Sequence, residues 1–196
     1  TANNERFLRL FWEVSNEKIA RNKEDSSKWY LFNKGGGFRK WYGNLQHVVN
    51  WEDDGSEIKY WVTHNPNDPN TTSWSRRIFN TNLYFCKGIT WSVISSGNIS
   101  FRTIDENAMI SNAAGGIFGF DSDESLNLLI SALNSKIWTK IFSLLNPTLN
   151  YSSGIIQNAP VPKLLDHSLA AECISISKSD WDSFETSWDF KKHPLL

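Results

Sequence analysis

Apolar residues recur at helical spacing near both ends of the chain. The pattern in residues 4–22 predicts a helix with Asn4 as its cap, because one side collects Phe7, Leu8, Leu10, Phe11, Val14 and Ile19. The clearest helix is predicted at 121–146, whose apolar positions are Leu126, Leu129, Ile130, Leu133, Ile137, Ile141 and Leu144. Asp121, Ser122 and Asp123 offer caps for it, and Pro147 ends it.

Between residues 29 and 101 the pattern changes to short runs rich in aromatic and β-branched residues. Turn residues separate the runs, among them Asp54-Gly55, Gly97-Asn98 and the prolines Pro66 and Pro69. Strands are predicted at 38–42, 47–51, 58–62, 77–79, 89–94 and 99–103. The order of helix, strands and helix predicts an α+β fold rather than a βαβ repeat.

The composition changes again after Pro160 and Pro162. Two short helices are predicted there, at 164–177 and at 180–188, the second capped by Ser179. We therefore expect a β-rich domain with flanking helices over 1–162 and a helical C-terminal appendage over 163–196.

The composition favours a folded core without disulfides or metal. Among 196 residues there are 10 Trp and 12 Phe, and each such ring buries roughly 150–250 Å². Cys86 and Cys173 have no metal-ligand spacing, which favours a reducing, cytoplasmic setting. No apolar run approaches the roughly 20 residues of a membrane helix. Because the chain starts at Thr1 and its only methionine is Met109, we expect it to be a fragment of a longer protein.

The net charge of −1 is uninformative, but the charges are segregated along the chain. Residues 18–40 carry seven basic and two acidic residues, and residues 76–102 carry four basic residues and no acid. Such segregation can build one positive face on a neutral protein, although chance spacing of surface charge would give the same counts.

The stretch from Asn33 to Tyr42 combines three glycines with basic and aromatic side chains. Glycines 35–37 would let the backbone approach a phosphate closely, while Lys34, Arg39 and Lys40 bring positive charge. The plainer interpretation is a glycine turn between strands with solvated lysines. Residues 90–98 alternate bulky and polar side chains, so hydroxyls and Asn98 are expected to face outward beside a buried Trp91. An ordinary half-buried strand and turn would show the same pattern.

Catalytic motifs find little support in the sequence. The glycine run lacks the Gly-Lys-Ser/Thr ending of a phosphate loop, and Asn146-Pro147-Thr148-Leu149 lacks the second proline and the aromatic residue of a base-gripping methyltransferase motif. Glu52, Asp53, Asp54 and Glu57 read as a tight acidic turn, and the four histidines have no metal-ligand spacing.

The chain resembles the C-terminal region of the adenine-specific DNA methyltransferases of BREX phage-exclusion systems, the PglX type, and the related recognition halves of fused type II restriction-methylation enzymes. The matching stretches lie in order along nearly the whole chain: TANNERF from Thr1, 34–44, VVNWE from Val48, KGITWS from Lys87, LNSK from Leu133, LNPTLN from Leu145 and DWDSFETSWDF from Asp180. The resemblance implies a parent enzyme that methylates adenine N6 with S-adenosylmethionine. The catalytic domain would precede Thr1, so this fragment would carry no cofactor and would not transfer methyl groups.

The resemblance further implies that the fragment recognises double-stranded DNA and contacts its own methyltransferase domain and other phage-defence subunits. We expect phosphate contacts from Lys34, Gly36, Arg39, Lys40, Arg76, Arg77 and Lys87. Candidates for reading bases are Trp41, Asn44, Ser92, Ser95, Ser96, Asn98 and Arg102. The flipped adenine would enter the catalytic domain.

Three other functions remain open from the residues alone. A carbohydrate-binding module would use the same Trp, Tyr, Asn and Asp side chains and would bind glycans independently of salt. A protein-interaction scaffold would dock partners through the Trp-rich surface and the acidic C-terminal helices, without affinity for DNA. A small hydrolase would use the acids at 52–57 and would lose activity when one carboxylate is replaced.

Overall fold

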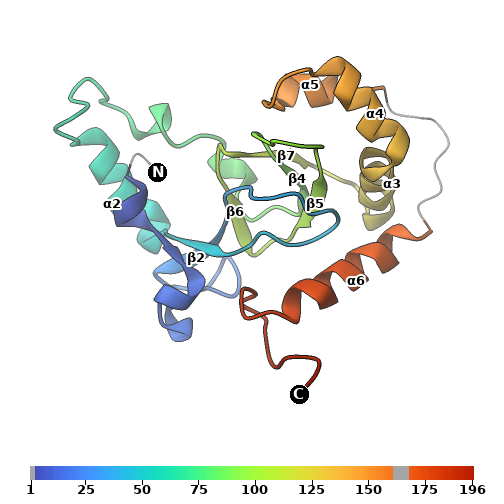
Figure 1. Cartoon of the computed structure of the whole chain (residues 1–196). Helices are drawn as coiled ribbons and strands as arrows, with labels where there is room; N and C mark the ends of the chain where they lie inside the picture. Colours follow the sequence, from blue (N-terminus) through green and yellow to red (C-terminus); the bar gives the residue numbers. More distant parts are fainter. Residues whose placement is uncertain (1–2, 161–167) are drawn as a thin grey trace.

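The computed structural model describes residues 3–160 and 168–196 and confirms the predicted α+β class. The helices are α1 (Asn4–Phe7), α2 (Glu52–Thr63), α3 (Asp123–Asn134), α4 (Lys136–Leu145), α5 (Ser153–Gln157) and α6 (Ala170–Asp182). The strands are β1 (Leu8–Leu10), β2 (Trp29–Asn33), β3 (His47–Asn50), β4 (Gly88–Ser92), β5 (Phe101–Ile104), β6 (Ala108–Ile110) and β7 (Ala114–Phe118). Figure 1 shows the strands in the middle of the molecule, with α2 at one end and α3, α4 and α5 at the other.

The first sheet has the strand order β1-β3-β2-β6, and only the β2–β6 pair is parallel. Strand β2 is buried on both faces because its side chains alternate between two cores. Tyr30 and Phe32 join a cluster with Ile58 and Val62 of α2, while Leu31 packs on the opposite face. Burial on both faces explains why β2 reads as a continuous apolar run without alternation.

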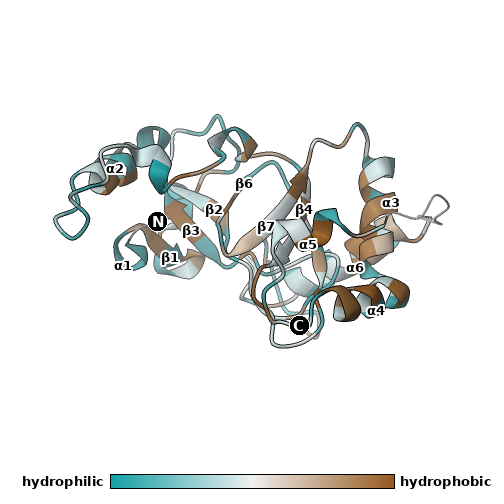
Figure 2. Ribbon diagram, turned by 90° about the horizontal axis from the view of Figure 1, so that it is seen from above, coloured by the Kyte–Doolittle hydropathy of each residue, from teal (hydrophilic) through white to brown (hydrophobic). Residues whose placement is uncertain are grey.

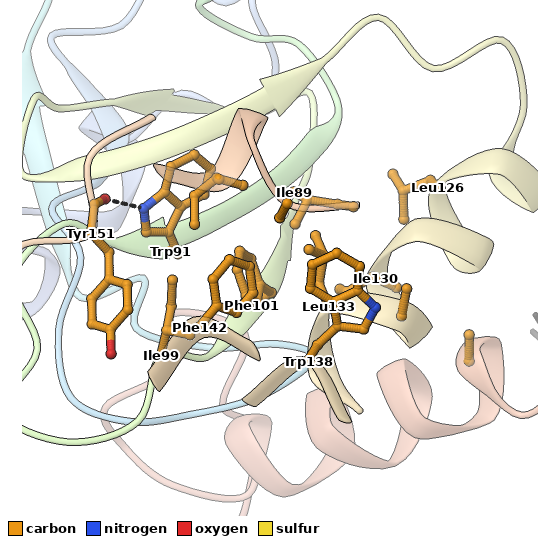
Figure 3. Close-up of a cluster of buried hydrophobic side chains, with 14 residues drawn as sticks. Ile89, Trp91, Ile99, Phe101, Leu126, Ile130, Leu133, Trp138, Phe142 and Tyr151 are labelled. Atoms are coloured by element: carbon orange, nitrogen blue, oxygen red, sulfur yellow. Dashed lines mark hydrogen bonds between the residues drawn. The ribbon is translucent and has the colours of Figure 1, made fainter. Parts of the chain in front are cut away.

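The second sheet is antiparallel, with the order β5-β4-β7. One face is apolar: Ile89, Trp91 and Phe101 pack against side chains of α3 and α4, as Figure 3 shows. The alternate residues form a polar face, on which Thr90 of β4 lies opposite Arg102 of β5. This polar face is also buried, and the segment that covers it contains the predicted glycine stretch.

Three of the six predicted strands are confirmed, as β3, β4 and β5. The strand predicted at 58–62 was wrong: Ile58 and Val62 are four residues apart on α2 and reach the same core. The runs at 38–42 and 77–79 form no strand; Trp41 makes one isolated bridge to Arg102, and Ile78 is buried in a turn. The glycine-containing β7 was not predicted, nor were β2 and β6.

The helix predicted at 4–22 was wrong beyond its first turn. Leu8, Arg9 and Leu10 instead pair with β3, so a tertiary ladder replaces helical hydrogen bonds. The helix predicted at 121–146 exists but is broken at Ser135, where α3 and α4 meet at 65°. Ser122 caps α3, and α4 ends at Leu145, two residues before Pro147.

Residues 168–196, the described C-terminal part, contain one helix, α6, where two helices were predicted. It passes through Ser179, so the cap and the separate helix at 180–188 were wrong. The start of the helix predicted at 164–177 and the boundary at 162/163 fall at residues 161–167, outside the described residues. Helix α6 packs against α3, and its Ala170 and Trp181 enter two different hydrophobic clusters.

Helix α4 has an exposed apolar side, seen as brown ribbon in Figure 2. Ile137 and Leu144 are 72% and 76% exposed, while Trp138 and Phe142 of the same helix are buried. In the described part of the chain no single helix is long and apolar enough to cross a membrane; only the bent pair α3 and α4 together meets those criteria.

Candidate nucleic-acid interface

Residues 33–44, here called the glycine loop, leave the end of β2 and cross to the second sheet. The Asn33 carboxamide accepts a hydrogen bond from the Gly35 amide at 3.0 Å. Gly35 has φ +81°, and a Cβ there would lie 3.0 Å from the Ala113 carbonyl oxygen. Gly36 has φ +133°, and its Cβ would lie 2.8 Å from the Asn44 side chain. The two glycines are therefore required by backbone conformation and by close approach.

Side chains of the glycine loop and of the second sheet fasten the loop in place. The Ser92 hydroxyl donates to the Gly36 carbonyl at 2.8 Å, and the Asn44 amide donates to the Gly37 carbonyl at 2.8 Å. Further along, the Arg39 amide donates to the Ser100 hydroxyl at 3.2 Å. These bonds leave the loop little freedom to move away from the sheet.

The tip of the glycine loop, Gly36–Phe38, is exposed and has unused hydrogen-bond donors. Within the described chain, the backbone N–H groups of Gly36, Gly37 and Phe38 donate no hydrogen bond. Backbone N–H groups without a partner at an exposed glycine turn are available to an anion such as phosphate. The geometry thus supports an anion site at the tip.

Arg102 lies buried beneath the loop with no exposed surface. Its Nη1 donates to the Arg39 carbonyl and its Nη2 to the Ser92 hydroxyl, each at 3.2 Å. Its Nε has no partner, and among the described residues no carboxylate forms an ion pair with it. Burial, with a smaller effect of the nearby Arg39 charge, lowers the pKa of Arg102 to about 10. The site therefore holds a buried positive charge without a compensating anion.

Five of the six predicted phosphate-binding cations, all but Lys34, are engaged within the described part of the chain. Arg39 pairs with Asp180 at 3.0 Å and stacks over the Trp181 ring. The ammonium of Lys40 donates to the Asn134 carbonyl at 2.6 Å, and burial lowers the pKa of Lys40. Lys87 pairs with Asp123 at 2.6 Å, at the opposite end of β4 from Ser92.

The other predicted cations lie in two places. Lys34 is at the base of the glycine loop, half-exposed, and makes no ion pair among the described residues. Arg76 and Arg77 lie on the segment that follows α2, away from the loop. Arg77 pairs with Asp68, and this hydrogen bond holds the pKa of Asp68 below its usual value.

The predicted base readers divide into a buried and an exposed group. Ser92 and Arg102 are buried and hold the glycine loop, so neither side chain reaches the surface in this structure. Trp41 and Asn44 belong to the loop itself and have positive φ angles of 72° and 64°; the value is strained for tryptophan, whereas asparagine adopts this region readily.

The exposed group lies on the turn after β4. Ser96 and Asn98 are exposed there, while the Ser95 hydroxyl bonds the Gly97 and Asn98 carbonyls. The structure thus brings together eight predicted residues at the loop: Lys34, Gly36, Arg39, Lys40, Trp41, Asn44, Ser92 and Arg102. It does not bring Arg76, Arg77 or Lys87 to them.

Two anchoring residues were missed by the sequence analysis. The Asn134 side chain bonds both the N–H and the carbonyl of Phe101, at 3.1 and 3.0 Å, and so fastens α3 to β5. Ser100 joins Arg39 to Arg102. A polar residue directly after the apolar Ala132 and Leu133 was the available indication for Asn134.

The acids considered for hydrolysis lie at the start of α2, where residues 53–55 form a left-handed turn. Glu57 accepts hydrogen bonds from Arg6 at 2.8 Å and from Asn50 at 2.7 Å, and the bond from Arg6 lowers the pKa of Glu57. Asp54 pairs with Lys59. The ion pairs give these carboxylates a structural role.

Replacing Gly36 by alanine is expected to lower the free energy of unfolding by about 1–3 kcal/mol, because alanine is strained at this φ and collides with Asn44. Urea denaturation measures the loss. The matched control is Gly37→Ala, since a Cβ at Gly37 meets nothing within 4 Å. Equal stabilities of the two variants would contradict the described loop conformation.

Lys178 of α6 fastens the C-terminal segment to the glycine loop. Its ammonium donates to Asp182 at 2.8 Å, to Asp189 at 3.0 Å and to the Tyr42 hydroxyl at 3.3 Å. Burial lowers the pKa of Lys178, but these hydrogen bonds and the Tyr42 charge outweigh it and raise the pKa above its usual value. Burial raises the pKa of Tyr42 to about 12.

The contact between Lys178 and Tyr42 is expected to weaken at alkaline pH. The pKa of Tyr42 is higher in the folded protein than the 10.0 of an ordinary tyrosine, so its contribution is complete below pH 10 and is lost as the pH rises towards about 12. Urea denaturation at about pH 9 and about pH 11 should show a larger loss for the wild type than for Tyr42→Phe. Arg102, whose pKa is lowered, changes stability in the opposite direction, but it does so equally in the wild type and in Tyr42→Phe, so its effect cancels in the comparison. Equal losses of stability in the two proteins would refute the raised pKa of Tyr42.

Comparison with known proteins assigns the chain to a protein family. No protein-family model matches the chain. It is 36% identical over 194 residues to the adenine-specific methyltransferase BrxX of Escherichia coli O9:H4 (strain HS), covering 97% of this chain and 15% of that protein. It is also 36% identical over 207 residues to the adenine-specific methyltransferase PglX of Lacticaseibacillus casei (strain Zhang), covering 100% of this chain and 16% of that protein. The chain therefore belongs to the BrxX and PglX family of adenine-specific methyltransferases, of which it represents one segment.

Proposed function

We propose that this chain is the part of a BREX-type adenine-N6 DNA methyltransferase that recognises a specific sequence in double-stranded DNA. One observation carries the proposal: an uncompensated buried cation, Arg102, lies beneath an exposed turn with three unused backbone donors. The relatives are named adenine-specific methyltransferases, which supports adenine as the base that the parent modifies. Methyl transfer and S-adenosylmethionine binding would belong to the rest of the parent, outside this segment.

Phosphate binding at the tip follows from simple electrostatics. A phosphate oxygen can accept hydrogen bonds from the N–H groups of Gly36, Gly37 and Phe38, as anions do in other backbone concavities. The positive charge of Arg102 acts from a buried position, where it is less screened than at the surface. Lys34 adds a second charge at the base of the loop.

Sequence selection is assigned to the exposed turn after β4. Phosphate contacts fix the position of a protein on DNA, whereas base edges are read by side chains with free donors and acceptors. Ser96 and Asn98 fit this requirement because they are exposed on the turn after β4. Trp41, Asn44, Ser92 and Arg102 would shape the reading surface rather than touch bases.

The test is fluorescence anisotropy with a pool of short duplexes at two salt concentrations. Affinity should fall steeply as salt rises, because bound phosphates release counterions. Lys34→Gln should weaken binding several-fold and reduce the magnitude of the log–log salt slope by about 0.9, the contribution of one phosphate contact. The matched control, Lys140→Gln, removes an exposed lysine of α4 and should leave binding unchanged. A DNA affinity that does not change with salt concentration would refute the proposal.

A further inference from the structure

Arg39 directly follows the exposed tip of the glycine loop, and its charge is paired with an acid of α6. The Arg39 Nη1 donates to Asp180 Oδ2 at 3.0 Å, which is the one hydrogen bond of this guanidinium within the described chain. A guanidinium has five N–H donors, so most of them have no acceptor here. The Arg39 side chain is 29% exposed, and part of the guanidinium is therefore accessible to a second anion.

The backbone of Arg39 is held by contacts that do not involve Asp180. Its N–H donates to the Ser100 hydroxyl and its carbonyl accepts from Arg102, each at 3.2 Å. The guanidinium carbon lies 4.9 Å from the centroid of the buried Trp181 ring. A guanidinium stacked on an aromatic ring keeps its N–H edge free to bind an anion. Removal of the Asp180 carboxylate would therefore free these donors without releasing the loop.

The carboxylate of Asp180 has no second partner among the described residues, and its side chain is 57% exposed. The neighbouring acids Asp182 and Asp189 pair with Lys178 instead. Ion pairs as exposed as the one between Arg39 and Asp180 contribute little to the stability of a protein. A competing anion can therefore displace Asp180 with little effect on the fold.

We infer that Asp180 competes with a DNA phosphate for Arg39 and thereby limits the DNA affinity of the glycine loop. The inference rests on the proposed function, because the phosphate comes from DNA bound at the tip. A phosphate at the N–H of Phe38 would lie beside the residue that follows, Arg39, whose guanidinium binds phosphate and carboxylate with the same fork of donors. The two anions repel each other, so a phosphate on Arg39 displaces Asp180.

The experiment measures the affinity of the chain for the pool of short duplexes by fluorescence anisotropy at two salt concentrations. Asp180→Asn should bind about three- to tenfold more tightly than the wild type at low salt, because Arg39 then has no competing carboxylate. The gain in affinity should shrink at the higher salt concentration, since salt screens interactions between exposed charges.

Two further variants separate competition for Arg39 from a general effect of charge. Glu172→Gln is the matched control, because Glu172 is an exposed acid of the same helix and makes no ion pair within the described chain. It removes the same negative charge and should change the affinity by less than about twofold. When Arg39→Gln is already present, the additional change Asp180→Asn should produce no gain in affinity. Circular dichroism confirms that each variant is folded.

The outcomes separate the competition from DNA recognition itself. Equal affinities of Asp180→Asn and the wild type, with salt-dependent binding by both, would overturn the competition and leave DNA recognition standing. An equal gain in Glu172→Gln, or a gain that persists without Arg39, would identify a general charge effect and would also overturn the competition. Absence of binding by every variant at low salt would overturn both proposals.

Discussion

Replacing Trp91 by alanine is expected to lower the free energy of unfolding by about 3–5 kcal/mol, the range for large aromatic residues in a core. Trp91 is 1% exposed, lies 5.9 Å from the Phe101 ring and donates its indole N–H to the Tyr151 carbonyl at 2.8 Å (Figure 3). The substitution removes this hydrogen bond and leaves a cavity between the second sheet and its helices.

Urea denaturation followed by circular dichroism measures the loss. Trp12→Ala is the matched control, because Trp12 is 50% exposed and contributes to none of the three clusters. Its replacement should change stability by less than about 1 kcal/mol. Similar losses for the two variants would show that Trp91 is not at the centre of the core.

Replacing Arg102 by alanine is expected to lower stability by about 2–4 kcal/mol and to remove most of the DNA affinity. The variant loses the donors to Arg39, Ser92 and Ser100 that hold the glycine loop. It also loses the charge beneath the tip. Unfolding in urea and anisotropy with DNA measure the two effects separately.

Arg102→Met distinguishes a positioning role from simple packing. Methionine fills much of the same volume and removes a buried unpaired charge, so stability should recover at least partly towards that of the wild type. DNA affinity should remain low, because neither the charge nor the hydrogen bonds return. Wild-type DNA binding by a stable Arg102→Met variant would contradict the role of Arg102 at the site.

Helices and strands were predicted correctly where the local pattern of apolar residues agrees with the packing of the element in the fold. Helix α3 follows its apolar spacing and its Ser122 cap, and β4 follows its β-branched and aromatic residues. The helix prediction for residues 4–22 failed because residues 8–10 pair with β3, which lies nearly 40 residues away in the sequence. No local pattern contains that information.

The structure brings part of the predicted site residues together at the glycine loop, and their contacts with DNA stay a prediction. Gly36 and Asn44 lie where a phosphate-binding loop was expected. Arg102 looked like a surface cation but is buried, because alternation on β5 turns it towards the loop rather than towards solvent. The cavity of about 300 Å³ between the two sheets could not be predicted, since Asn80 and Asn112, which both line it, are 32 positions apart in the sequence.

Helix α6 has a consequence for how the chain folds during synthesis. It is made after both sheets, yet it contributes Ala170 to one hydrophobic cluster and Trp181 to another. A nascent chain emerging from the ribosome has completed both sheets while these two apolar surfaces still lack their last partners. Shortened chains that end before α6 should therefore be the species most in need of chaperones.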